Sequence, residues 1–400
     1  MHEIGHEYLC KDEDSLTAWL NERPEAVRQN CAVFIAARSA LRVLPIAVEG
    51  LQFSDWSRKR DLTAIACVSG AFISSVAAKL PTDDMRNAAL RPARRAATAS
   101  DSAAADASDA AAYAAYAAAF AYDAAFAYDA AYAYAAAFAR TAFAATAAVW
   151  RNVRADCVVW VNHAAADGTC GIDVAPLIDG EFNISPDWPV VREKLLNDND
   201  PKRGADWSFW IEWYDNILRG DPQDWDMLYE IAVSQDIDWE ATSREVNAAI
   251  ARIVEKHRLL REIAHLKAQR HQLVSLTASA EMRSHNMPPE LVDDEAWVTQ
   301  SIQIIWDTMD EAEEELREEK PEPSRLKYLG EVLLKATAEV IIRYCGPKAD
   351  IMVTAFAKAI GTTAGVAAAG WLVTQLATQA EAARKIGNGL VEFAKLLLGG

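Results

Sequence analysis

The chain of 400 residues is long enough for two or three domains, and hydrophobic residues make up 52% of it against 24% charged residues. This composition excludes a globally disordered protein. Acidic residues outnumber basic residues by 58 to 40, so the formal net charge is −18. Such a charge opposes binding of the whole chain to nucleic acid or to an anionic membrane. We therefore expect no nucleic-acid partner.

The N-terminal sequence and the cysteine pattern favour a cytoplasmic protein. The first residues are acidic and contain no apolar segment of the secretory type. Six cysteines, at positions 10, 31, 67, 157, 170 and 345, are scattered and form no CxxC pair. Scattered cysteines are typical of free thiols in a reducing compartment.

The N-terminal region is predicted to be helical. Within residues 15–44, apolar residues recur at steps of three and four, as on the buried face of a helix. Pro45 is expected to end this stretch. A second apolar run covers residues 62–80, and Thr82 or Asp83 is expected to cap the helix that follows.

Residues 101–149 form the most unusual segment. Of its 49 residues, 28 are Ala and ten are Phe or Tyr. A six-residue repeat runs through it as FAYDAA (120–125), FAYDAA (126–131), YAYAAA (132–137) and the decayed FARTAF (138–143). Alanine at this density predicts helix. Six-residue steps spread the aromatic residues around every side, so the helix has no polar face and must be covered. One rod and two packed helices are both allowed.

Residues 156–163 are short and β-branched, which allows a strand, although continuation of the helix is favoured. Residues 166–190 are rich in Gly, Asp and Pro and predict a loop. A tryptophan-rich helix follows, with Asp206 as its N-cap and Gly220 after its last turn. Its apolar stripe consists of Trp207, Trp210, Ile211, Tyr214, Ile217 and Leu218. Trp213 lies off this stripe and is the candidate for an exposed contact surface.

A long polar helix is predicted over residues 244–274. Its apolar seam suggests a coiled coil or a helical hairpin, and it carries a local excess of basic residues together with His257, His265 and His271. The histidine spacings of eight and six do not suit a metal site, which favours one helical turn. Residues 275–290 predict a linker.

The C-terminal region predicts a helical hairpin followed by weakly amphipathic helices. Apolar residues at steps of four and three predict one helix. These residues are Val298, Ile302, Ile305, Met309, Ala312 and Leu316. Residues 320–324 predict a turn, with Ser324 as the cap of the return helix. The sequence thus predicts an all-α, elongated protein of several helical modules. Their expected ranges are 1–155, 156–243, 244–275, a linker over 276–290, and 291–400.

The tryptophan-rich block DWSFWIEWYDNILRGDPQDW (206–225) and the tail HNMPPELV…KPEPSRLKYLGEVLLKA…GPKADIMVTAFAKAIG are the distinctive segments. With the alanine-rich tract, they resemble a group of chiefly alphaproteobacterial, alanine-rich helical proteins that carries no assigned activity. The resemblance covers most of residues 90–375. It implies an all-helical, modular protein and transfers no catalytic residue.

One segment matches a metal-binding motif. His2, Glu3 and His6 match HExxH, in which two histidines bind Zn²⁺ and the glutamate activates water. Gly5 weakens the helix that this motif needs, and the other histidines lie far away in the sequence. We keep a zinc metalloprotease only as a minor alternative. No catalytic, cofactor-binding or metal-ligating residue is expected otherwise, because the chain has no P-loop, GxGxxG, GxSxG or CxxC motif.

A ridge of small residues marks the C-terminal region, formed by Ala357, Gly361, Gly365 and Ala369. Ridges of this kind bring helices close together, in membranes and in water. We therefore expect a non-enzymatic, self-associating helical scaffold that forms a homo-oligomer and binds a further protein partner. In the alternative, the protein is a membrane-active effector or toxin, and the helices of residues 348–398 insert conditionally.

Overall fold

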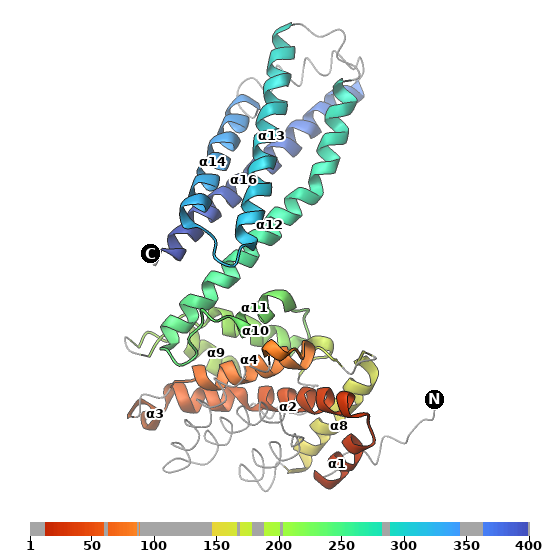
Figure 1. Cartoon of the computed structure of the whole chain (residues 1–400), viewed down its shortest axis with the longest axis vertical. Coiled ribbons are helices and arrows are strands. Elements are labelled where there is room, and N and C mark those ends of the chain that lie inside the picture. The colour runs from red at the N-terminus through yellow and green to blue at the C-terminus, as the bar shows by residue number, and fades with distance from the viewer. Residues whose placement is uncertain are drawn as a thin grey trace. The chain divides into compact units, whose positions relative to one another are not determined.

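The computed structural model describes residues 13–59, 63–85, 88, 146–165, 169–177, 188–200, 203–281, 289–344 and 363–398, and every regular element among them is a helix (Figure 1). The predicted all-α class is confirmed. The chain divides into two compact units, the N-terminal unit of residues 1–251 and the C-terminal unit of residues 252–400. This division falls inside the segment 244–275, which the sequence analysis treats as a module of its own.

The N-terminal unit is a bundle of mostly short helices around the long helix α2. Its elements are α1 (Glu13–Asn21), α2 (Glu25–Val48), the π-helix η2 (Glu49–Phe53), α3 (Asp55–Lys59), α4 (Ile65–Lys79), α8 (Thr146–His163), the 3₁₀-helix η3 (Ile172–Val174), α9 (Trp188–Leu196), α10 (Ser208–Arg219) and α11 (Trp225–Val233). Helix α2 packs against α4 and α8. Most of the alanine-rich tract lies outside the described residues, and its last four residues begin α8.

The prediction that Pro45 ends the second helix is wrong, because α2 continues to Val48. Proline has no N–H, so the carbonyl of Leu41, one turn earlier, loses its helical partner. The hydroxyl of Tyr214 on α10 donates to this carbonyl at 2.7 Å. Leu44 and Val48 are buried on either side of Pro45. Burial of this face and the Tyr214 bond together offset the lost helical hydrogen bond.

Two further expectations in this unit have clear outcomes. Residues 156–163 are helical within α8, as favoured. The loop predicted over 166–190 is too long at its end, because α9 already begins at Trp188. Trp188, Val191 and Leu195 are buried at steps of three and four, which favours a helix. Pro189 lies in the first turn, where its missing N–H removes no helical hydrogen bond.

Helix α10 ends as predicted and begins one residue later than predicted. Its N-cap position is Trp207, and the carboxylate of Asp206 accepts instead from the backbone N–H of Ser208 at 2.9 Å. At the other end, Gly220 has φ +71°. Its N–H donates to the carbonyl of Ile217 at 3.2 Å, and the next N–H donates to the carbonyl of Asn216 at 2.9 Å. These two bonds form a Schellman motif, which requires the left-handed conformation of glycine.

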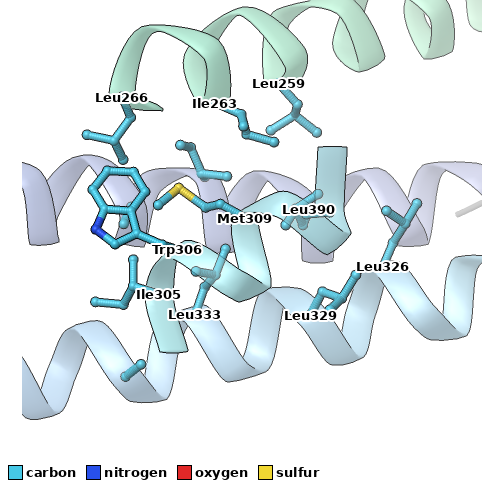
Figure 2. Close-up of a cluster of buried hydrophobic side chains, with 14 of the residues drawn as sticks. Leu259, Ile263, Leu266, Ile305, Trp306, Met309, Leu326, Leu329, Leu333 and Leu390 are labelled. Carbon is cyan, nitrogen blue, oxygen red and sulfur yellow. The ribbon is translucent and has the colours of Figure 1, made fainter. Parts of the chain in front are cut away.

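The C-terminal unit contains four long helices around one apolar core. They are α12 (Ser243–Glu281), which begins in the N-terminal unit, α13 (Pro289–Arg317), α14 (Pro323–Tyr344) and α16 (Thr363–Leu397). Figure 2 shows side chains from all four helices meeting in this core. The core includes Leu259, Ile263, Leu266, Ile305, Trp306, Met309, Leu326, Leu329, Leu333, Leu390 and Phe393. The predicted hairpin of α13 and α14 is confirmed.

Two boundaries in this unit differ from the predictions. The linker predicted over 275–290 is too long, because α12 extends to Glu281 and α13 begins at Pro289. Ser324 is not the cap of the return helix, since Pro323 already occupies its first helical position. The backbone N–H of Glu322 donates to the buried carboxylate of Glu315 at 2.6 Å. A carboxylate on α13, seven residues earlier, thus holds the start of the return helix.

Helices α14 and α16 approach closely through two glycines. A Cβ atom placed on Gly330 would lie 2.7 Å from the carbonyl oxygen of Gly387 and 2.8 Å from Cγ2 of Val391. A Cβ atom on Gly387 would lie 3.0 Å from the carbonyl oxygen of Gly330. The absence of side chains at both positions therefore sets how close the two helices come.

Candidate functional site

A buried ionic cluster in the N-terminal unit joins α2 to α8. Arg38 and Arg42 lie one turn apart on α2, and both bind the carboxylate of Asp156 on α8. Nε of Arg38 and Nη2 of Arg42 both donate to Oδ1, at 2.6 and 2.7 Å, and Nη1 of Arg42 donates to Oδ2. The carboxylate side chain is fully buried.

The same two arginines hold the loop that contains η3. The guanidinium of Arg38 donates to the carbonyls of Ile172 at 2.9 Å, Ala175 at 3.0 Å and Pro176 at 2.8 Å. Arg42 donates from Nε to the next carbonyl, that of Leu177, at 3.2 Å. Two guanidiniums and one carboxylate would leave one buried positive charge, and the carbonyl oxygens of this loop stabilise it.

The cluster is suited to a structural role and not to acid–base catalysis. Burial by itself would raise the pKa of Asp156, but the charges and hydrogen bonds of Arg42 and Arg38 outweigh burial and hold the pKa below its ordinary value. A carboxylate that stays ionised and accepts three charged donors is a poor proton acceptor. Burial lowers the pKa of Arg38. We assign the cluster to positioning α8 and the η3 loop against α2.

Sequence reasoning missed this cluster. The available signal was a pair of arginines, Arg38 and Arg42, placed at positions i and i+4 inside an otherwise apolar helical stretch. Charged residues on a buried helix face require partners. The partner Asp156 lies 114 residues beyond Arg42, and no local spacing rule connects them.

Trp207, Trp210 and Trp213 of the tryptophan-rich block are core residues, and two of their indole N–H groups are paired. Trp207 donates to Asp198 at 3.2 Å and Trp210 donates to Asn247 at 2.8 Å. Trp213 is only 3% exposed, so the expectation of an exposed contact at this residue is wrong. Its ring packs edge-on against Phe72 of α4, with ring centroids 5.4 Å apart. Helix α4 supplies a second apolar wall that the stripe of α10 alone did not reveal.

Within the described residues, the indole Nε1 of Trp213 is buried and has no hydrogen-bond partner. An unpaired buried N–H costs free energy. The ring of Trp213 packs against Phe72 of α4 and against Trp210 of its own helix. This residue therefore stabilises the core through area and ring geometry rather than through a polar bond.

Two basic residues of α12 in the C-terminal unit, Arg258 and Lys267, are engaged in ion pairs. Arg258 donates to Glu255 at 2.6 Å and also binds Glu262 on its own helix. Lys267 lies 2.5 Å from Asp310 and 2.6 Å from Glu313 on α13. These hydrogen bonds raise the pKa of Lys267. Neutralised in this way, the cations offer little to a phosphate backbone.

Several predicted site residues fall outside the description. The HExxH segment, with His2 and His6, lies before the first described residue. In the small-residue ridge, Ala357 and Gly361 also lie outside the described residues. Gly365 and Ala369 belong to α16, but the packing around these two residues is not described. Self-association through this ridge stays a prediction.

The described residues contain neither a metal-binding cluster nor a membrane-spanning helix. No group of three or more His, Cys, Asp or Glu residues in that part of the chain could hold a metal ion. No described helix is both long and apolar enough to cross a membrane.

The outer face of α14 carries two of the large apolar side chains that are exposed among the described residues, Tyr328 and Ile342. We define this face by Tyr328, Glu331, Val332, Lys335, Glu339 and Ile342. The side chain of Tyr328 is 63% exposed and that of Ile342 is 73% exposed. Glu331, Lys335 and Glu339 are also exposed, whereas Val332 is half-buried. This face is our candidate interaction surface.

Comparison with known proteins supplies no assignment. No family model, no curated protein and no solved structure matches the chain.

Proposed function

We propose that the protein is a non-enzymatic helical interaction protein that associates with further copies of itself through the C-terminal unit. The supporting observation is the exposure of Tyr328 and Ile342 on the outer face of α14. These residues lie 14 positions apart, which is close to four helical turns, so both point to the same side of the helix.

The core of the C-terminal unit is complete without this face. Leu326, Leu333 and Val340 of α14 are buried in the core from the opposite side of the helix. Two large apolar side chains on the solvent side therefore contribute little to folding of one copy. They gain free energy when a second surface removes them from water.

Light scattering combined with sedimentation tests the proposal on the full chain. We expect a discrete oligomer whose population rises with protein concentration, and we expect Ile342→Glu to weaken it at least tenfold. Leu196→Glu is the matched control, because Leu196 on α9 is also exposed, at 54%, but lies in the N-terminal unit. A monomer at every concentration, or equal loss in both variants, would contradict the proposal.

Deletion of residues 348–400 is a poor test of association. The described part of this segment places Ile386, Leu390 and Phe393 in the core of the C-terminal unit. Removing it would expose the apolar surface of α14, and the truncated protein would aggregate for that reason alone. The same packing opposes release of α16 for conditional membrane insertion, because release would open this core.

A further inference from the structure

We propose that two copies of the chain pair along the outer face of α14, with the two helices antiparallel. This inference rests on the proposed function and adds the orientation and the contacts of the pair. It follows from the geometry of the helix and from the order of charges along it.

The outer face is directed away from the core of its own unit. An α-helix turns about 100° per residue, so Glu331, Glu339 and Ile342 all lie within about 40° of Lys335 around the helix axis. Leu326 and Leu333 lie about 160–180° away and are buried in the core. A partner helix can therefore meet this face without displacing α13 or α16.

Charges of alternating sign run along this helix at every fourth position. They are Lys327, Glu331, Lys335, Glu339 and Arg343. Two parallel copies in register would place like charges at the same level, which is destabilising. Two antiparallel copies centred at Thr337 place opposite charges at the same level. The alternation thus favours antiparallel pairing.

Antiparallel pairing about Thr337 matches both charge and apolar residues. Lys335 is then level with the partner's Glu339, and Glu331 is level with the partner's Arg343. Val332 is level with the partner's Ile342. Each match occurs twice, because a two-fold axis repeats it. The apolar side chain with the largest exposure on this helix, Ile342, is thereby covered by the partner's Val332 towards each end of the contact.

The charges are available for such contacts. Among the described residues, Glu331 has one ion pair, with Lys327 at 3.9 Å, and both side chains are about 60% exposed. Neither Lys335 nor Glu339 has an ion pair in that part of the chain. A long, solvated pair within one helix holds its side chains weakly, so little is lost when they turn to a partner.

Charge-inverted variants test the contact. Lys335→Glu and Glu339→Lys are each expected to weaken self-association at least tenfold when studied alone, because each brings like charges together. A one-to-one mixture of the two variants restores opposite charges across the interface, so we expect it to form a heterodimer with an affinity within about threefold of the wild-type dimer. Sedimentation with one variant fluorescently labelled measures this affinity.

Control inversions belong on α16, where Lys395 and Glu392 form an exposed pair at 2.7 Å. Lys395→Glu and Glu392→Lys are expected to leave association unchanged. Circular dichroism of every variant verifies that the helices are intact. Single variants that keep wild-type affinity, or a mixture that stays monomeric, would overturn the proposed pairing.

Spin labels test the orientation separately. With Cys10 and Cys345 replaced by serine, Ala338→Cys and Ser324→Cys each provide one exposed labelling position on α14. In the antiparallel pair, labels at 338 lie close together and labels at 324 lie about 39 Å apart along the axis. Equal separations at both positions would indicate parallel helices and overturn the proposal.

The two proposals fail in distinguishable ways. A wild-type protein that is monomeric at every concentration removes both. An oligomer that Ile342→Glu dissociates, but that the inversions at 335 and 339 leave unchanged, keeps the proposed function and removes the antiparallel contact.

Discussion

At the scale of single residues, the N-terminal unit depends on buried polar groups whose partners lie far away in the sequence. Asp156 sits between Arg38 and Arg42, and the carbonyl of Leu41 accepts from Tyr214. Such groups contribute modestly when paired but cost much when one partner is removed. Single substitutions at these positions should therefore have large effects on stability.

Asp156→Asn is expected to lower the free energy of unfolding by about 3–5 kcal/mol, because it leaves two buried guanidiniums without a counter-charge. Asp236→Asn, at an exposed position, should change it by less than about 0.5 kcal/mol. Urea titration followed by tryptophan fluorescence measures both. Equal small losses would show that the loop carbonyls alone satisfy the arginines.

The pH dependence of stability should carry the signature of Asp156. The pKa of this carboxyl is lower in the folded protein than in the unfolded chain. Its contribution is therefore fully present above the unfolded pKa of about 4 and is lost as the pH falls towards the folded pKa. The difference in unfolding free energy between wild type and Asp156→Asn should be constant above about pH 5 and shrink below about pH 4. A constant difference down to pH 2.5 would contradict this.

The pairing of Tyr214 with the carbonyl that Pro45 leaves free can be isolated by a double-mutant cycle. Tyr214→Phe is expected to cost about 1–3 kcal/mol, since it leaves a buried carbonyl unpaired. In a Pro45→Ala background the restored backbone N–H serves that carbonyl, so the same substitution should cost about 1 kcal/mol less. Tyr229→Phe, whose hydroxyl makes an exposed contact with Thr82 at 3.1 Å, is the control. Equal costs in the two backgrounds would mean that Tyr214 acts through packing alone.

At the scale of elements, periodicity predicted most helices and failed where distant contacts decide. The steps of three and four between residues 298 and 316 correctly indicated α13, and Gly220 correctly indicated the end of α10. The prediction that Pro45 ends α2 was wrong because the donor that compensates for its missing N–H is on α10. The prediction that Trp213 is exposed was wrong because α4 covers the side of α10 that lies off the apolar stripe. Local rules contain neither partner, and the cluster around Asp156 was missed for the same reason.

The contact of α14 with α16 should be sensitive to a single methyl group. Gly330→Ala places a Cβ 2.7 Å from the carbonyl oxygen of Gly387, so the helices must separate. We expect a loss of about 1–3 kcal/mol, although alanine favours helix by about 1 kcal/mol. Lys385→Ala, at an exposed position of α16, should be nearly neutral. Urea titration followed by circular dichroism measures the loss, and a stabilised Gly330→Ala protein would show that the glycine contact is loose.

At the scale of the whole molecule, two compact units with separate cores should unfold as two transitions. Ten of the 13 tryptophans lie within residues 1–251, so fluorescence mainly reports the N-terminal unit, whereas circular dichroism reports the helices of both. Asp156→Asn should shift the fluorescence midpoint, and Gly330→Ala should shift only part of the circular dichroism signal. Equal shifts of both signals in both variants would indicate a single cooperative unit.

The ionic cluster also has a consequence for synthesis of the chain. Arg38 leaves the ribosome 118 residues before Asp156 and still earlier than the carbonyl of Pro176. At about 5–20 residues per second, the remaining 138 residues up to Pro176 take roughly 7–28 s. During that interval α2 carries two guanidiniums on a face that cannot yet be buried. The nascent N-terminal unit therefore remains open to chaperones for most of its synthesis, and its folding completes late, after the loop that follows α8 has emerged.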